Sequence, residues 1–315
     1  MRLMLRFAFL LLLSLTCLNA QIRVGIVGTD TSHVPAFTRL LNDPSAPDHV
    51  PGARVVAAYK GGSKDIESSW SRVDKFAEEI KTKWGVEIVP DIPTLCSKVD
   101  AVLLESVDGR PHLEQARQVI QAGKPLFIDK PLSSTYDDAK EIARLAKQAG
   151  VPWFSTSSLR YSEIVPVLKA ANPHSVITWG PGPEEPHHYL DLSWYAIHPI
   201  EMLFAIMGPG CEEVTRTVGR NGDVVTCRWK DGRLGTVQTL RPSGEYGGVA
   251  FREKGAAVRS PEKAKSNYAA LVKEIVKFFQ TRQPPVPNEE TLEIFAFMDA
   301  AQRSKEAGGK PTRLR

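Results

Sequence analysis

Short apolar runs alternate with amphipathic segments through the first half of the chain. The runs that have the length and composition of buried strands are 22–28, 54–59, 87–89, 101–105, 125–129 and 151–156. The segments that repeat apolar residues at helical spacing are 32–41, 71–84, 112–122 and 135–146. Such alternation predicts a parallel sheet with helices on both faces. We therefore expect residues 21–158 to form a Rossmann-like, doubly wound α/β domain.

The pattern changes after residue 158. A helix is predicted at 190–207, and the strand-like runs that follow it are 213–218, 224–229 and 233–240. The last two runs are joined by Lys230-Asp231-Gly232, and Asp-Gly between such runs indicates a hairpin. Amphipathic helices are predicted at 268–279 and 290–306. Residues 159–315 are therefore expected to form an α+β domain with a mainly antiparallel sheet.

The N-terminus has the pattern of an export signal. Arg2 and Arg6 precede an apolar run, and the small residue Ala20 closes it. We predict a Sec-type signal peptide at residues 1–20 and an exported protein, periplasmic or extracellular. The apolar run is shorter than the roughly 20 residues that span a bilayer. Without cleavage, the same segment would be an N-terminal anchor; after cleavage no membrane span is expected.

Charge and cysteine content narrow the function classes. The 315 residues carry a formal charge of +4, and removal of Arg2 and Arg6 leaves +2. This even balance, without a dense basic stripe, argues against a nucleic-acid partner. Beyond the signal segment, Cys96, Cys211 and Cys227 form no metal-binding spacing. Either Cys211 and Cys227 form a disulfide, which export permits, or all three are buried thiols.

The turn after the first strand departs from a dinucleotide-binding loop. Such a loop needs Gly-x-Gly-x-x-Gly, so that the backbone can approach the pyrophosphate. Gly28 matches the first glycine, but Asp30 and His33 occupy the second and third positions. A carboxylate there repels a pyrophosphate. After the second strand, Lys60 suits a 2′-phosphate, or is simply a solvated lysine.

Two further motifs carry a family resemblance. Asp129-Lys130-Pro131 follows an Ala-Gly-Lys turn and the fifth strand, and Arg160-Tyr161 follows the sixth. Together with the run from Pro111 to Glu114, this arrangement resembles the Gfo/Idh/MocA oxidoreductase family over residues 22 to about 310. The resemblance implies NAD or NADP bound by the Rossmann domain, a second domain that covers the substrate, and homo-oligomers formed through its sheet. The residues it places at the cofactor are Gly28, Thr29, Asp30, Ser32, His33, Lys60, Glu105, His112, Asp129, Lys130 and Arg160.

The same resemblance suggests catalytic residues. It places Lys130 beside the nicotinamide and the reacting hydroxyl; otherwise this lysine only extends from a strand end. His198 matches the general base of the family's second motif, although Trp194 replaces the aspartate of that motif. On a helix, Asp191 and Tyr195 would share a face with His198, and either could replace the missing partner. A buried core histidine is the alternative for His198.

A metal site is not expected from the sequence. His187 and Asp191 have i, i+4 spacing, and His188 and His198 lie nearby, but no third ligand is determined.

These observations predict an NAD(P)-dependent oxidoreductase that acts on a hydroxyl of a sugar or polyol by hydride transfer. Two alternatives remain: a redox-neutral glycosidase that retains NAD, and an exported binding or non-redox protein that keeps the fold without ordinary dinucleotide binding.

Overall fold

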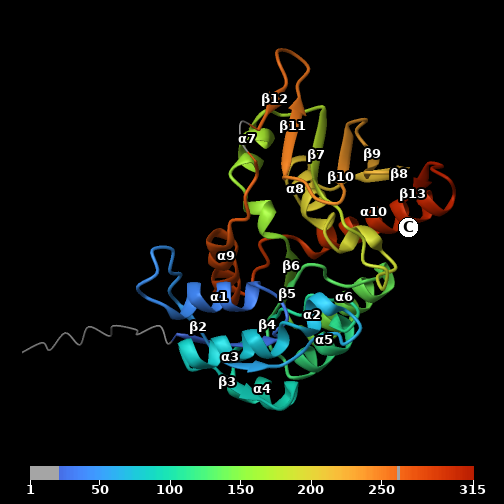
Figure 1. Ribbon diagram of the computed structural model, residues 1–315. Coiled ribbons are helices and arrows are strands. Elements are labelled where there is room, and N and C mark those ends of the chain that lie inside the picture. Colours follow the sequence, from blue (N-terminus) through green and yellow to red (C-terminus); the bar gives the residue numbers. More distant parts are fainter. Residues whose placement is uncertain (1–20, 261–262) are drawn as a thin grey trace, which may run out of the picture.

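The computed structural model describes residues 21–260 and 263–315, and Figure 1 shows their two sheets and surrounding helices. The predicted signal peptide, residues 1–20, lies outside the described residues. No helix among the described residues combines the length and apolar character needed to cross a membrane.

The first sheet contains six parallel strands in the order β3-β2-β1-β4-β5-β6. Its strands are β1 (Ile22–Val27), β2 (Ala53–Tyr59), β3 (Glu87–Val89), β4 (Ala101–Leu104), β5 (Leu126–Asp129) and β6 (Trp153–Thr156). Its helices are α1 (His33–Asn42), α2 (Glu67–Trp70), α3 (Val73–Trp84), α4 (Ile92–Lys98), α5 (His112–Gln121) and α6 (Tyr136–Ala149). Strands β4, β5 and β6 are buried throughout, as apolar strands covered on both faces must be. The predicted Rossmann-like sheet is confirmed.

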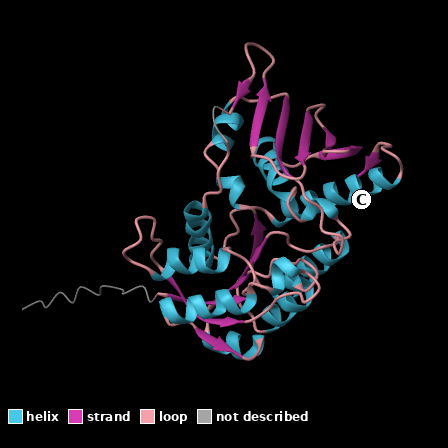
Figure 2. Ribbon diagram, viewed as in Figure 1, coloured by secondary structure: helices cyan, strands magenta, loops and turns pink. Residues whose placement is uncertain are grey.

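The second sheet has seven strands in the order β12-β11-β7-β10-β9-β8-β13. They are β7 (Ser175–Pro181), β8 (Cys211–Gly219), β9 (Gly222–Trp229), β10 (Leu234–Leu240), β11 (Gly247–Phe251), β12 (Val258–Arg259) and β13 (Thr312–Arg313). Every pairing except β7 with β10 is antiparallel, which confirms the mainly antiparallel prediction. The strands alternate buried and exposed positions, so that one face packs on helices (Figure 2). Cys211 and Cys227 form a disulfide, while Cys96 is a buried free thiol.

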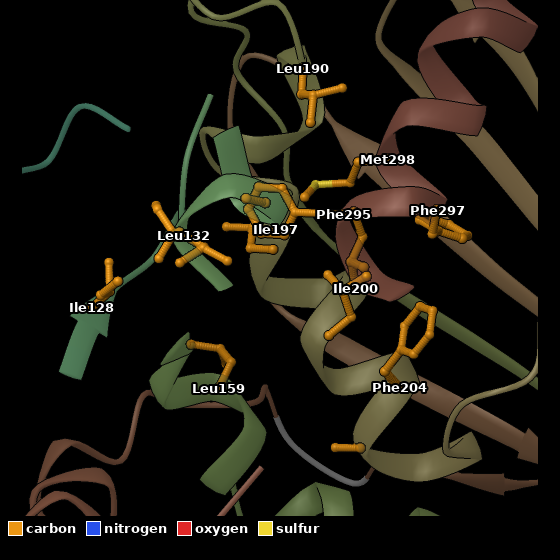
Figure 3. Close-up of a cluster of buried hydrophobic side chains, with 14 of the residues drawn as sticks. Ile128, Leu132, Leu159, Leu190, Ile197, Ile200, Phe204, Phe295, Phe297 and Met298 are labelled. Carbon is orange, nitrogen blue, oxygen red and sulfur yellow. The ribbon is translucent and has the colours of Figure 1, made fainter. Parts of the chain in front are cut away.

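Helices of the C-terminal half pack on both sheets. They are α7 (Ile164–Ala170), α8 (Ile197–Met207), α9 (Tyr268–Thr281) and α10 (Asn288–Glu306). Helix α9 returns to the first sheet, where Leu271 and Phe278 join a core that includes Phe37 of α1. A second core runs between the two sheets, where Ile128 and Leu132 share a cluster with Ile197 (Figure 3). The loops after β5 and β6 therefore lie against α8.

The predicted helix at 190–207 is wrong in its first turns. Residues 191–193 form a single 3₁₀ turn (Asp191–Ser193), and α8 begins only at Ile197. The Asp191 carboxylate is bound by Arg216 and Lys305, at 2.6 Å from a nitrogen of each. These long-range ion pairs hold the turn out of the helix. As a result, Asp191 does not share a helical face with His198, and His187 and Asp191 are not one helical turn apart.

Candidate active site

Most of the predicted cofactor residues lie along the carboxyl ends of β1, β4 and β5, the edge at which such sheets bind ligands (Figure 1). Within this group only Ser32 is exposed. The buried members are Gly28, Thr29, Asp30, His33, Glu105, His112, Asp129 and Lys130. This edge brings the carboxyl groups of Asp30, Glu105 and Asp129 together with Lys130. Its chemistry depends on the hydrogen bonds and ion pairs that each of these groups makes.

The turn after β1 is packed against protein. Gly28 has φ +91°, and a Cβ there would lie 2.5 Å from the backbone nitrogen of Ser106. This glycine therefore allows the loop after β4 to approach the turn. Thr29 donates its backbone N–H to the Gly61 carbonyl and its hydroxyl to the Val73 carbonyl. The loop after β2 thus closes over the turn.

Asp30 replaces the glycine whose backbone would face a pyrophosphate. Its carboxylate accepts hydrogen bonds from the Val107 N–H at 3.1 Å and from the Ser69 hydroxyl at 2.6 Å. Burial raises the pKa of Asp30 to about 6, although both hydrogen bonds oppose the shift. Phosphate binding needs free N–H groups and positive potential, whereas this turn offers a buried carboxyl group. The Asp30 side chain therefore offers no favourable contact to the pyrophosphate of a dinucleotide.

His33 and Asp129 form a buried pair. His33 Nδ1 lies 2.5 Å from Asp129 Oδ2, and the His33 ring is stacked on Phe37 with Tyr268 at its edge. Asp129 Oδ1 accepts the N–H of Lys130 at 2.8 Å. Burial alone would raise the pKa of Asp129, but the His33 and Lys130 contacts outweigh it and lower that pKa. The pair fixes the end of β5.

Glu105 is the least satisfied charged group among the described residues. It is fully buried directly after β4, and neither of its carboxylate oxygens has a hydrogen-bond partner. Burial, followed by the charge of Asp129, raises the pKa of Glu105 well above its usual value.

Lys130, Tyr195 and His198 come together between the two sheets. The Lys130 ammonium lies 5.5 Å from the centre of the Tyr195 ring, a cation–π distance. The Tyr195 and His198 rings meet edge-on, with centroids 6.1 Å apart. Tyr195 is 39% exposed, whereas Lys130 and His198 are nearly buried. This arrangement places an ammonium and an imidazole beside one partly open aromatic ring.

His198 is held by Ser157, which directly follows β6. The Ser157 hydroxyl lies 2.6 Å from His198 Nδ1. Burial, followed by the charge of Lys130, keeps the pKa of His198 well below its usual value. The imidazole is therefore neutral at physiological pH and able to accept a proton.

An open hollow adjoins this group. It measures about 530 Å³, and its lining residues are Trp179, Glu245, Tyr246, Gly247, Arg259, Ser260 and Lys263. Tyr246 belongs both to the hollow and to the contacts of His198, since the two ring centroids are 5.5 Å apart. Aromatic faces with a few charged groups are typical of sites for polar small molecules.

Three predicted site residues lie in other environments. Asp191 is bound by Arg216 and Lys305 instead of contacting His198. Lys60 is exposed and bonds to Asp74 at 2.7 Å. Arg160 joins Glu201 of α8 to Glu290 of α10, so its side chain ties helices together. His112 is at the edge but bridges the Ser106 and Leu132 carbonyls.

Sequence reasoning missed Ser157 and Tyr246 as neighbours of His198. Ser157 could have been found, because it stands at the carboxyl end of a predicted parallel strand. Tyr246 carries no such signal, since its contact with His198 arises only from the packing of the second sheet on α8. The buried pair of His188 and Asp108, 2.9 Å apart, was missed for the same reason.

Comparisons with known proteins bear on the family and the fold. Residues 22–157 match the model of the Gfo/Idh/MocA oxidoreductase family, described as an NAD-binding Rossmann fold. A myo-inositol 2-dehydrogenase of Thermotoga maritima is 30% identical over 192 residues, which cover 52% of this chain and 57% of that enzyme. The chain thus matches little more than half the length of this relative.

Two solved structures share the whole architecture. A probable dehydrogenase from Thermotoga maritima has a TM-score of 0.72 at 22% identity, covering 93% of this chain and 99% of that one. A myo-inositol dehydrogenase from Lactobacillus casei, in complex with NAD(H) and myo-inositol, has a TM-score of 0.72 at 18% identity, covering 94% and 97%. At these identities the likeness establishes the fold.

Proposed function

Because the chain belongs to the Gfo/Idh/MocA oxidoreductase family, we propose that it oxidises a hydroxyl group of a sugar or polyol, with NAD or NADP as the hydride acceptor. Family membership favours this function over a binding protein without redox activity. The observation that carries the proposal is the meeting of Lys130, Tyr195 and His198. The inositol substrates of the similar enzymes support a polyol as the substrate class.

Lys130 would stabilise the reacting oxygen. Its ammonium is nearly buried, so its field is screened less than that of a surface lysine. A substrate hydroxyl next to it would become more acidic, because the positive charge favours the alkoxide. Tyr195 covers one side of the ammonium and restricts where that oxygen can lie.

His198 would take the hydroxyl proton. Its neutral imidazole has Nδ1 engaged by Ser157, which leaves Nε2 for the substrate. A general base of this kind contributes about 10²- to 10⁴-fold to the rate.

The nicotinamide, when bound, would accept the hydride from the substrate carbon. Since the buried carboxyl group of Asp30 offers a pyrophosphate no favourable contact, we assign no cofactor contact to that side chain.

Cofactor binding is the first test. Calorimetry of the purified chain with NAD, NADH, NADP and NADPH should detect at least one of them with a dissociation constant below about 1 mM. With that cofactor, myo-inositol and simple sugars are then screened for turnover. No binding of any of the four contradicts the proposal.

Lys130 is the second test. Lys130→Ala should lower turnover by about 10³-fold, because the developing alkoxide loses its countercharge. The matched control is Lys169→Ala, a lysine at the end of α7, which should keep full activity. Unchanged turnover in Lys130→Ala would remove this residue from the mechanism.

Export and self-association belong to the same proposal. The signal-like N-terminus and the Cys211–Cys227 disulfide support an oxidising compartment. Exposed Val218, Val224 and Leu234 on the second sheet support an assembly through that sheet. Secretion assays of the full chain and light scattering of the purified protein test these two points.

A further inference from the structure

Three potential metal ligands converge beneath the carboxyl edge of the first sheet. They are His33 at the start of α1, Glu105 after β4 and Asp129 at the end of β5. One ligand atom from each lies within 4.8 Å of the others, and all three residues are buried. The ligands come from the ends of adjacent elements of a rigid sheet, so their spacing is set by the fold.

Glu105 supplies an independent sign that a ligand belongs there. Both of its oxygens are buried and accept no hydrogen bond from any described residue. Burying an unpaired carboxylate is costly, and proteins normally satisfy such groups with donors, a countercharge or a metal ion. Here the described donors are directed elsewhere: the Lys130 N–H bonds to Asp129, and the Val107 N–H bonds to Asp30.

The charge balance calls for a cation. The charged groups that act on Glu105 are Asp129, Asp30 and Lys130. With Glu105 itself, three carboxyl groups surround one ammonium and the imidazole of His33, so the cluster holds more acidic groups than basic ones. A bound divalent cation would offset this excess.

We propose that His33, Glu105 and Asp129 bind a divalent transition-metal ion such as Zn²⁺ or Mn²⁺. One imidazole nitrogen with two carboxylates is a common ligand set for these ions, whereas Ca²⁺ and Mg²⁺ prefer oxygen ligands alone. Zn²⁺ bonds to nitrogen and oxygen at about 2.0–2.2 Å, so bound ligand atoms would lie about 3–3.5 Å apart. In the structure the ligand atoms lie within 4.8 Å of one another and His33 Nδ1 contacts Asp129 Oδ2 at 2.5 Å, so the side chains must rearrange for all three to bind one ion.

The three ligands are also residues that the family resemblance places at the cofactor, so the metal site lies on the edge of the sheet that the proposed cofactor would occupy. Neither the Lys130–His198 chemistry nor a dinucleotide is needed for the metal to bind. A failure of the metal proposal would therefore leave the oxidoreductase proposal standing, and the reverse also holds.

The test is metal binding by the purified full chain. After treatment with a chelator, the protein is titrated with ZnCl₂ and with MnCl₂ in a calorimeter, and the bound metal is counted by elemental analysis. We expect one equivalent per chain with a dissociation constant of about 10 μM or tighter for one of the two ions. Glu105→Gln should weaken binding by at least about 100-fold, since it removes a charged ligand. Glu114→Gln, an exposed acid on α5, is the matched control and should bind normally.

Cobalt provides a second readout, because its spectrum reports which ligand atoms hold the ion and not only how tightly it binds. Co²⁺ in the same site should give visible absorption bands of nitrogen and oxygen coordination, and His33→Gln should change them while circular dichroism stays the same. Absence of stoichiometric metal at about 1 mM free ion overturns the proposal. Binding and cobalt spectra that Glu105→Gln and His33→Gln both leave unchanged also overturn it, because the metal would then lie elsewhere.

Discussion

Two buried groups of charges in this molecule are built in opposite ways. The first, which we call the balanced network, consists of three carboxylates and three cations: Asp191, Asp223 and Glu184 with Arg216, Arg241 and Lys305. The second, the acid cluster, consists of Asp30, Glu105 and Asp129 with His33 and Lys130. Both lie next to the sheets, and both contain buried carboxyl groups.

They differ in how their charges are satisfied. In the balanced network, the fully buried Arg216 donates to Asp191 at 2.6 Å and to Asp223 at 2.9 Å from its Nε. Lys305 and Arg241 bind the same two carboxylates from outside. In the acid cluster, Glu105 has no hydrogen-bond partner, and three carboxyl groups share only Lys130 and His33. Proteins tolerate such an excess mainly at functional sites, so the comparison separates a structural network from a candidate ligand site.

The largest expected loss of stability comes from a substitution that breaks the balanced network. Arg216→Met leaves two carboxylates short of a buried partner, and the free energy of unfolding should fall by about 4 kcal/mol. Arg228→Met is the control, because Arg228 makes only exposed ion pairs with Glu212 and Glu213, and should lose less than about 1 kcal/mol. Urea unfolding measures both. Equal losses in the two variants would erase the distinction drawn between buried and surface pairs.

The next effect concerns the acid cluster and pH. The pKa of Asp30 is raised in the folded protein to about 6, so the fold favours the neutral acid. Its stabilising contribution is present below the unfolded pKa of about 4 and is lost as the pH rises through 6, by about 3 kcal/mol in all. Asp30→Asn keeps the acceptor for the Val107 N–H and cannot ionise.

The difference in unfolding free energy between wild type and Asp30→Asn should therefore shift by about 3 kcal/mol in favour of the variant between pH 3.5 and pH 7.5. Urea unfolding across this range is the measurement. A difference that does not change with pH would mean that Asp30 ionises as easily as an exposed acid.

A smaller effect, on turnover, is expected at His198, which lies near Lys130 of the acid cluster. His198→Gln should lower turnover by about 100-fold, because the general base is lost. In the wild type, the lowered pKa of His198 predicts that activity declines only well below pH 6.5, where the imidazole becomes protonated. Steady-state rates from pH 4.5 to 8 measure both. His174→Gln, at an exposed histidine, serves as the control, and a profile that declines at pH 6.5 would contradict the buried neutral imidazole.

The smallest effect concerns the ring beside the ammonium. Tyr195→Leu removes the cation–π contact with Lys130 and should lower kcat/KM by about fivefold, or about 1 kcal/mol. Tyr195→Phe retains the ring and should lose less. Steady-state kinetics of the two variants decides the point: equal losses would assign the effect to the hydroxyl.

Sequence patterns were most successful where contacts are local or repeat along the chain. Periodicity located β1, α3, α6 and α10 to within a few residues, since their burial follows spacing alone. Strand β7 and the start of α8 were not found. Both depend on distant partners: β7 lies between β10 and β11, and the turn before α8 is held by Arg216.

For the candidate site, the family resemblance placed Glu105, Asp129 and Lys130 at the cofactor, and the structure brings all three to one edge of the first sheet. The spacing of Asp191 suggested that it is a partner of His198, but in the structure Asp191 pairs with Arg216 and Lys305. The real neighbour is Ser157, 41 residues before His198, and no local pattern encodes that approach.

The sequence by itself determined the order of elements, the two sheet types and the unusual Asp30 and His33 in the first turn, because these follow from periodicity and residue identity. Only the tertiary structure decided which charges are paired. Asp191 pairs with Arg216 and Lys305, whereas the carboxyl group of Glu105 has no hydrogen-bond partner among the described residues. Electrostatic energy depends on the distances and burial that folding creates between residues far apart in the chain, so identical side chains become structural in one place and candidate ligands in another.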